Sequence, residues 1–481
     1  MKTRNTPTLL VVIVAGFLAL SAAHVQGHMI GINVHLNQPA SNNILQDLGA
    51  HGQVLDVLPQ INGVTLRAQS SELSTIQALP YVEGANADAT FDLASGANYW
   101  SLDAVNVTDF GTGRVVGYDG AGVYVAVIDS GLPFNWRAYF SEERIAVDLA
   151  RSFEGGGGER GTVSSQPETW ERDTLGHGIA VTSVILGFRY NLSDPPLPST
   201  FDGVAPEATI IPVRCFREPN WARNSVLARA IVYVTDLKVG GALGNSPLVI
   251  NMSFGGFDED VLERAAIDYA IANGVVPVAA AGNEADAGMR FPGRYAPVIS
   301  AGATGSVGEF PPEDPTLIEW ILNDVVENDP SQHFIAPFSA WELPGQDLDV
   351  LAPGYLPPAA GPLPSCGGGG GIGRVDYTYF GGTSAATPHV AGVAALMLQK
   401  NPGLTAAQIE EILENTALPL SPGCRNVRFT NLPNCTGHWY SWSWQDFANL
   451  VLFDAVLCWN EAAAGHGLVQ ADAALAATPL P

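Results

Sequence analysis

Three residues of the types that acyl transfer to a hydroxyl requires occur in this sequence, at Asp129, His177 and Ser384. Such a reaction needs a hydroxyl nucleophile, an imidazole base that takes its proton, and a carboxylate that orients the imidazole. Each residue also has a simpler interpretation, as a turn aspartate, a core histidine or a helix-capping serine. The elements that carry the three residues decide between these interpretations.

Ser384 stands before a run of small and apolar residues that reaches Leu398 without polar alternation. A helix that is apolar on all sides is a buried helix, so Ser384 is predicted at the N-terminus of a helix inside the core. The free N–H groups and the positive dipole end at that point stabilise a developing negative charge. Taken alone, this stretch is explained equally well by capping and by catalysis.

Asp129 directly follows the β-branched run 123–128, which is typical of a buried parallel strand. In open α/β sheets, ligands bind at the carboxyl ends of such strands. His177 lies between two glycines and opens another helix of small and apolar residues. Aspartate, histidine, serine is one of three chain orders known for such triads, so the three residues together favour a catalytic constellation.

Several motifs in register give the chain its resemblance to the subtilisin-like serine proteases, or subtilases. They are V-I-D-S-G at 127–131, G-H-G at 176–178, N-M-S-F-G-G at 251–256, A-A-A-G-N at 279–283 and G-T-S-A-A-T-P-H-V-A-G at 382–392. Each motif alone is weakly specific, but together they cover about residues 97–477 in the order of the family. The resemblance implies a serine endopeptidase that works through an acyl-enzyme, with Asp129, His177 and Ser384 as its triad.

The same resemblance implies roles for Asn283 and for the segment Ser253, Phe254, Gly255 and Gly256. Asn283 would donate its side-chain amide to the oxyanion, although an ordinary turn also explains an asparagine after glycine. The segment would pair with an extended substrate through its backbone, unless the two glycines only form a turn. Phe254, in place of a smaller aliphatic residue, leads us to expect large apolar side chains before the scissile bond.

Two positions depart from the usual pattern of the family. Ile179 stands where a threonine is usual, which removes a hydroxyl near the base, and Ala385 stands where a methionine is usual, which trims a packing residue. Neither departure removes a member of the predicted triad. A protein of this fold that binds without cutting would be expected to lack a triad or oxyanion residue, and all four are present.

Strands and helices alternate through most of the chain, which predicts a mostly parallel α/β sheet with helices on both faces. Predicted strands lie at 123–128, 210–213, 248–252, 275–280 and 298–301, and predicted helices near 179–186, 225–238, 261–273, 385–399 and 405–416.

Three parts are predicted along the chain. Residues 1–27 have a basic start and a short apolar run, as in a secretory signal peptide, with an uncleaved anchor as the alternative. Residues 28–95 have a β-α-β-β-α-β pattern, as in a small ferredoxin-like α+β unit. The resemblance implies an inhibitor-type propeptide removed by self-cleavage, with a permanent N-terminal domain as the alternative. Residues 96–481 would be the peptidase domain.

Three insertions interrupt the resemblance, at about 305–337, 355–379 and 421–464. The first is acidic, and the second is rich in proline and glycine, which predicts an irregular loop before Ser384. The third is rich in tryptophan and tyrosine, which we interpret as a satellite core rather than a ligand-binding surface.

Composition bounds the partners and the compartment. The net charge of −26 argues against nucleic-acid binding, and an odd count of five cysteines fits a secreted protein with one thiol left over. Cys215 ends an apolar strand and is the predicted free thiol, while the pairing of the others stays open. No cofactor for catalysis is implied, and a structural calcium is common in the family, but its ligands remain unknown. The expected partners are protein or peptide substrates and the chain's own propeptide, with no membrane contact after signal removal.

Overall fold

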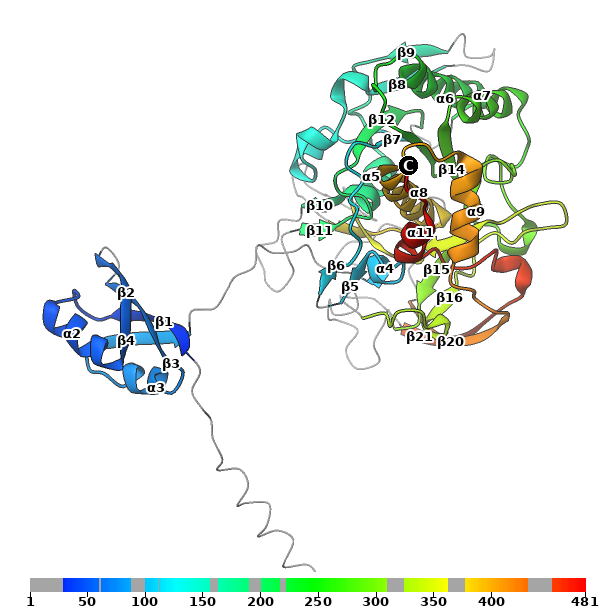
Figure 1. Cartoon of the computed structure of the whole chain (residues 1–481). Helices are drawn as coiled ribbons and strands as arrows, with labels where there is room; N and C mark the ends of the chain where they lie inside the picture. Colours follow the sequence, from blue (N-terminus) through cyan, green and yellow to red (C-terminus); the bar gives the residue numbers. More distant parts are fainter. Residues whose placement is uncertain are drawn as a thin grey trace, which may run out of the picture. The chain divides into compact units, whose positions relative to one another are not determined.

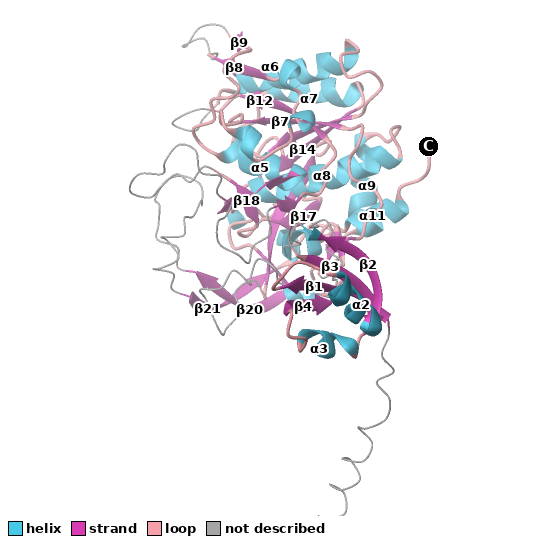
Figure 2. Ribbon diagram, turned by 90° about the vertical axis from the view of Figure 1, so that its left-hand side faces the viewer, coloured by secondary structure: helices cyan, strands magenta, loops and turns pink. Residues whose placement is uncertain are grey.

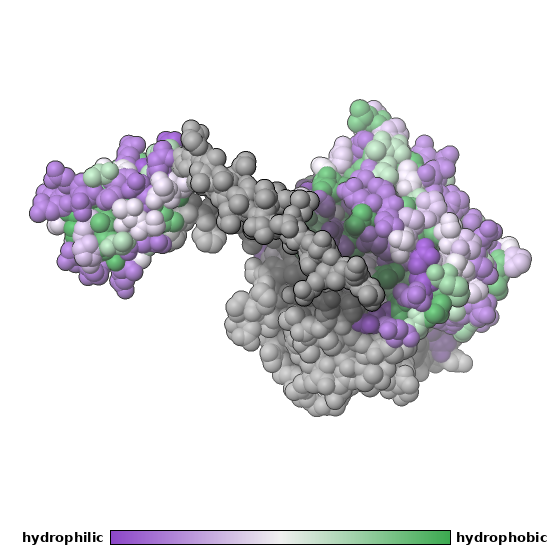
Figure 3. All heavy atoms as spheres, turned by 90° about the horizontal axis from the view of Figure 1, so that it is seen from below, coloured by the Kyte–Doolittle hydropathy of each residue, from purple (hydrophilic) through white to green (hydrophobic). Residues whose placement is uncertain are grey.

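The computed structural model describes residues 29–59, 62–87, 100–110, 112–155, 163–189, 200–216, 222–308, 324–361, 377–430 and 452–481. The chain divides into two compact units, Met1–Leu93 and Ala94–Pro481. The predicted signal peptide and the predicted self-cleavage region lie outside the described residues. Within the described part of the chain, no helix has the length and apolar character that a membrane span needs. Among the coloured residues of both units in Figure 3, hydrophilic residues are mixed with smaller hydrophobic areas.

The first unit has the predicted β-α-β-β-α-β order. Its elements are β1 (Met29–Leu36), α2 (Asn42–His51), β2 (Gly52–Leu58), β3 (Gly63–Gln69), α3 (Glu72–Gln77) and β4 (Val82–Ala87). The strands form an antiparallel sheet in the order β2-β3-β1-β4, which is the ferredoxin-like arrangement. Its own core contains Ile32, Leu36, Leu48, Leu66 and Ile76, all fully buried.

The second unit is built on a nine-stranded sheet in which most neighbouring strands are parallel, as predicted. The strand order is β16-β15-β14-β13-β7-β12-β8-β9, with β17 also beside β15. Only the β8–β9 and β15–β16 pairs within this sheet are antiparallel. The strands are β7 (Tyr124–Asp129), β8 (Arg151–Glu154), β9 (Ser164–Gln166), β12 (Thr209–Arg214), β13 (Leu248–Met252), β14 (Val275–Ala280), β15 (Ile299–Ser306), β16 (His333–Ile335) and β17 (Val350–Pro353).

Helices cover both faces of this sheet (Figures 1 and 2). The described helices of this unit are α4 (Trp100–Asp103), α5 (His177–Leu186), α6 (Asn224–Val239), α7 (Val261–Ala272), α8 (Thr383–Lys400), α9 (Ala406–Thr416) and α11 (Ala471–Ala477). The two-residue period of β7 divides the core, because Val125 and Val127 pack with α5 and α8 while Ala126 and Ile128 pack with α6 and α7.

Helix α8 is the buried helix that its sequence predicts. Every residue from Thr383 to Leu398 is buried, so the helix runs through the core beneath the sheet. Its small residues allow close approach of neighbouring segments. At Gly392, for example, an added Cβ would meet the Val204 side chain at 2.6 Å. Such close contacts keep the helix from sliding along its axis. The position of its first turn is fixed in the same way.

The described ends of the three predicted insertions form short strands that pair with one another or with the main sheet. In the first, β16 pairs with the end of β15. In the second, β18 (Pro358–Ala360) pairs with β19 (Tyr377–Tyr379), so the predicted irregular loop has strands at its ends. In the third, β20 (Gly423–Thr430) and β21 (Leu452–Trp459) form a hairpin. Short antiparallel pairs also join β5 (Thr108–Asp109) to β6 (Gly113–Arg114), and β10 (Gly187–Arg189) to β11 (Thr200–Asp202).

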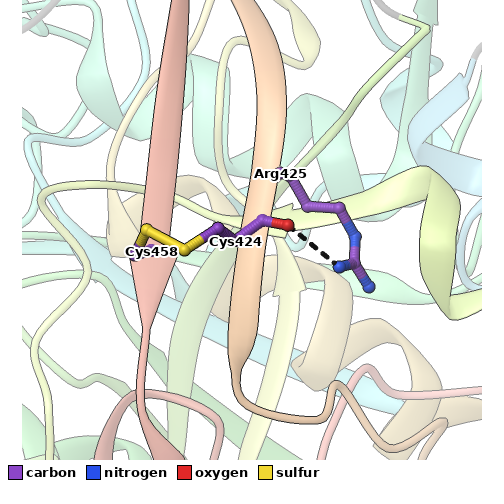
Figure 4. The surroundings of a disulfide bond; sticks show 3 residues. All are labelled: Cys424, Arg425 and Cys458. Atoms are coloured by element: carbon purple, nitrogen blue, oxygen red, sulfur yellow. Dashed lines mark hydrogen bonds between the residues drawn. A yellow bond between two sulfur atoms is a disulfide. The ribbon is translucent and has the colours of Figure 1, made fainter.

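A disulfide joins Cys424 to Cys458 across the β20–β21 hairpin (Figure 4). The Cys424 carbonyl accepts a hydrogen bond from Arg425 Nη1 at 3.2 Å. Cys215 is a buried free thiol, as predicted, and burial raises its pKa. The other two cysteines and the predicted tryptophan cluster at 439–444 lie outside the described residues.

Candidate active site

Asp129 and His177 meet at the carboxyl edge of the sheet. The C-terminal end of β7 carries Asp129, and His177 opens α5; both side chains are buried. His177 Nδ1 lies 2.8 Å from Asp129 Oδ1 and 2.9 Å from Oδ2. An ionised carboxylate can only accept, so Nδ1 carries the proton in this contact, and Nε2 becomes the basic nitrogen.

A turn held by Asp173 fixes the start of α5. Asp173 Oδ1 accepts the backbone N–H groups of Leu175 and Gly176, each at 2.9 Å. Burial, with a smaller effect of the Asp129 charge, raises the pKa of Asp173 to about 6. Asp173 is not among the site residues predicted from the sequence, although an aspartate shortly before a glycine-rich helix start is a turn signal that could have located it.

Ser130 and two glycines bring β7 and α5 together. The Ser130 hydroxyl accepts the Gly178 N–H at 2.8 Å. The α-carbon of Gly178 lies so close to the Gly131 backbone that an added Cβ would overlap it. This contact requires glycine at 178, and it sets the distance between the Asp129 strand and the His177 helix.

Ser384 is the second residue of α8 and is 2% exposed. Its hydroxyl donates to the Ser253 carbonyl at 2.9 Å, and the Ser253 hydroxyl donates to the Ser384 carbonyl at 2.9 Å. Phe380, four residues before Ser384, contacts the His177 ring edge-on with centroids 5.2 Å apart. The segment that leads into α8 therefore lies against the imidazole. In the nucleophile role predicted from the sequence, the Ser384 hydroxyl would have to release the Ser253 carbonyl before giving its proton to His177.

Asn283 is locked to the first turn of α8 through its side-chain oxygen. Asn283 Oδ1 accepts from the Thr383 N–H at 2.8 Å and from the Thr383 hydroxyl at 2.9 Å. The Thr383 hydroxyl in turn accepts the Gly282 N–H at 3.2 Å. Because both Thr383 groups are donors here, the amide oxygen must face them, and Nδ2 is directed elsewhere as a donor. The Asn283 amide thus stands beside the N-terminus that carries Ser384.

The segment 253–256 lies beside α8, with its first two residues buried and its two glycines exposed. Ser253 and Phe254 are buried, and the Phe254 ring packs on Phe216 with centroids 5.2 Å apart. Gly256 exchanges both backbone hydrogen bonds with Phe291, at 2.7 and 2.9 Å. Among the described residues, no hydrogen bond uses the backbone groups of Phe254 and Gly255, so these two positions are the ones that suit an extended peptide.

A separate group of carboxylates offers oxygen ligands to a cation. The group consists of Asp349, Glu410 and Glu414, whose oxygens lie within 4.8 Å of one another. Asp349 Oδ2 accepts from the Ser300 N–H and hydroxyl at 2.6 and 2.8 Å, while Oδ1 is buried without a hydrogen-bond partner in the described structure. Burial and neighbouring carboxylates raise the pKa of Asp349 to about 8 and of Glu410 to about 7. All-oxygen donors of this kind suit a hard divalent cation.

A mostly parallel sheet with an Asp–His pair at its carboxyl edge, and a serine opening a buried helix beside it, defines a subtilisin-like architecture. Residues 120–438 match the model of the subtilase family. The chain therefore belongs to the subtilase family, which is a family of serine endopeptidases.

Individual relatives agree with this assignment. Subtilisin E of Bacillus subtilis (strain 168) is 30% identical over 305 residues, which are 63% of this chain and 62% of the relative. Subtilisin of Bacillus pumilus is also 30% identical over 305 residues, covering 63% of this chain and 86% of the relative. The chain thus matches less than two thirds of the length of Subtilisin E.

A solved structure extends the likeness of the fold to nearly the whole chain. Fervidolysin from Fervidobacterium pennivorans, described as a keratinolytic enzyme related to subtilisin, superimposes with a TM-score of 0.51. The match has 23% identity and covers 95% of this chain and 62% of fervidolysin. At this identity the match supports the fold.

The position of Asn283 gives a kinetic prediction. If Asn283 has the oxyanion role predicted from the sequence, Asn283→Ala should lower kcat by about 10²–10³ with little change in KM, the size that this loss has in a subtilisin, because such a donor acts on the oxyanion only in the transition state. Steady-state hydrolysis of a peptide anilide would measure this. Asn273→Ala, at the end of α7, serves as a control. A raised KM with unchanged kcat would assign Asn283 to binding or to the turn alone.

Proposed function

We propose that this chain is a secreted serine endopeptidase, made as a self-processing zymogen, that hydrolyses peptide bonds of protein or peptide substrates. The observation that carries the proposal is the buried His177–Asp129 contact beside the first turn of α8, where Ser384 lies. Membership of the subtilase family supports the same reaction. Nucleic acid is not a proposed partner of this acidic chain.

In the proposed acylation step, the Ser384 hydroxyl leaves the Ser253 carbonyl and gives its proton to His177 Nε2 as Oγ attacks the substrate carbonyl carbon. Asp129 holds the imidazole through Nδ1 and stabilises the imidazolium that forms. The carbonyl oxygen becomes an anion beside the amide of Asn283 and the backbone N–H of Ser384. Both donors are fixed before the substrate arrives, so little reorganisation accompanies charge development.

In the second half of the reaction, the imidazolium gives its proton to the leaving amine, which departs and leaves an ester on Ser384. Water then attacks this ester, with His177 taking its proton. The same donors stabilise the second oxyanion. The bond between Ser384 Oγ and the acyl carbon then breaks, His177 returns its proton to Oγ, and the acid product leaves.

The proposed propeptide is the unit at 28–95. Its described elements have a ferredoxin-like sheet and a core of their own, so this unit can fold as a separate body. A separate unit at the N-terminal side suits a role as an intramolecular chaperone and inhibitor that is cut away afterwards. A permanent N-terminal domain is the competing proposal.

One time course separates these proposals. The chain without residues 1–27 is followed by intact mass and by hydrolysis of casein, beside Ser384→Ala. We expect the parent to lose the segment from residue 28 to about residue 90 and to gain activity. Ser384→Ala should stay whole and inert. Activity without a loss of mass would favour a permanent domain. A parent that stays whole and inert would favour a binding protein of this fold.

We also propose that the Asp349, Glu410 and Glu414 carboxylates hold a structural calcium ion. The support is the close approach of three carboxylates, one of them buried with an unpaired oxygen. Without a cation, burial favours their protonated forms and raises their pKa values. Calcium would replace those protons and would stabilise the native chain by mass action.

This proposal gives a pH-dependent prediction. Because the native pKa values of Asp349 and Glu410 are raised, the calcium-free protein binds more protons folded than unfolded, and its stability should fall as pH rises from about 4 to 8. Calcium should therefore raise Tm more at pH 8 than at pH 5, and Glu410→Gln should remove most of that rise. Differential scanning calorimetry would measure both. If calcium leaves Tm unchanged at pH 8 while Glu410→Gln raises it, the carboxylates share a proton instead.

A further inference from the structure

The Arg290 side chain occupies the space between two segments that border the proposed reaction centre. An added Cβ on Gly255 would meet Arg290 Cβ at 2.7 Å, and an added Cβ on Gly282 would meet Arg290 Cγ at 2.6 Å. Gly255 belongs to the proposed substrate-pairing segment, and Gly282 precedes the proposed oxyanion donor. The stem of Arg290 is therefore enclosed between the α-carbons of these two glycines.

The backbone around Arg290 fixes this position. The Arg290 N–H donates to the Ala281 carbonyl at 2.8 Å, and the next residue, Phe291, exchanges two hydrogen bonds with Gly256. The backbone of Arg290 is thus bonded to the segment that contains Gly282, and the backbone of Phe291 is bonded to the segment that contains Gly255. This pairing fixes the Cα of Arg290 and the direction of its Cβ, so the start of the side chain is held in this space.

The same space lies where a substrate side chain would have to go. A peptide whose carbonyl carbon is attacked by Ser384, with its oxygen at Asn283 and its backbone along Phe254 and Gly255, places one α-carbon between the two segments. This is the α-carbon of the residue on the acyl side of the scissile bond, because that residue carries the attacked carbonyl. In such a complex, the side chain of that residue would have to enter the space that the Arg290 stem occupies.

An ion pair neutralises the charge of Arg290. Arg290 Nη2 lies 2.6 Å from Glu284 Oε1, and Arg290 Nε donates to Glu284 Oε2 at 2.6 Å. Glu284 Oε2 also accepts the Asn283 N–H at 3.0 Å. The Arg290 side chain is 16% exposed. Because each charge already has its partner in this two-point pair, the stem should influence substrate choice by its size more than by the charge of the guanidinium.

From these contacts we propose that Arg290 restricts the residue before the scissile bond to a small side chain, such as that of glycine, alanine or serine. The inference rests on the proposed peptidase function and names its substrate class. It differs from the sequence-based expectation of large apolar side chains, which was drawn from Phe254 standing in place of a smaller aliphatic residue in the pocket wall. The Phe254 ring instead packs on Phe216 and is 8% exposed.

The test uses the processed enzyme and a series of peptide p-nitroanilides that differ only in the residue before the scissile bond. For the parent, kcat/KM should be at least about tenfold higher with alanine than with phenylalanine, the size expected when a pocket lacks room for added carbons. Arg290→Ala should lower this alanine-to-phenylalanine ratio at least about tenfold. Arg290→Met, which keeps a long stem without the charge, should retain the parent ratio.

Arg294→Ala is the matched control, because Arg294 is exposed and lies four residues further along the same loop. It should leave the ratio unchanged. A parent that cleaves after phenylalanine as well as after alanine, or an Arg290→Ala variant with the parent ratio, would overturn the inference while the peptidase function stands. Absence of hydrolysis with every peptide would overturn the proposed function and this inference with it. If Arg290→Ala does not fold, the parent ratio still tests the predicted restriction, and a ratio near one overturns the inference.

Discussion

The first turn of α8 begins inside the protein, and its N–H groups need partners there. Buried backbone donors without a partner are costly, and a helix start has several of them. The Thr383 N–H is satisfied by the Asn283 side chain, and the Ala385 N–H by the Gly382 carbonyl. The Ser384 N–H lies between these two, at the positive end of the helix. A site that stabilises a negative oxygen follows from this burial, and the proposed chemistry depends on it.

The same constraint explains why residues distant in sequence converge. Asn283 lies just after β14, Ser253 directly follows β13, and Asp129 is the last residue of β7. These three strands are neighbours in the sheet and run parallel to one another. Parallel strands deliver their carboxyl ends to one edge, and α8 packs beneath them with its N-terminus at that edge. The reciprocal hydrogen bonds between Ser253 and Ser384 tie the helix to the strand ends. Most of the geometry is therefore set by main-chain topology, and few side chains have to be adjusted.

Sequence alone was sufficient for features that depend on local pattern. The apolar run after Ser384, the β-branched run before Asp129 and the β-α-β-β-α-β order at the N-terminus each predict an element that the structure contains. Features that depend on contacts between distant segments could not be predicted. The packing of Phe254 on Phe216 and the pairing of Cys424 with Cys458 are of this kind. The place of Arg290 between Gly255 and Gly282 is the clearest example, because three separate loops define it.

The proposed reaction depends on His177, oriented by Asp129, activating Ser384. A fluorophosphonate probe tests this activation, because such probes react with an activated serine hydroxyl. We expect a single adduct on Ser384 of the processed chain, located by peptide mass spectrometry. The labelling rate should fall at least about a hundredfold in Asp129→Asn, where the imidazole loses the partner that fixes its tautomer. No adduct, an adduct on another serine, or equal rates in the parent and Asp129→Asn would show that Ser384 is not activated in this way.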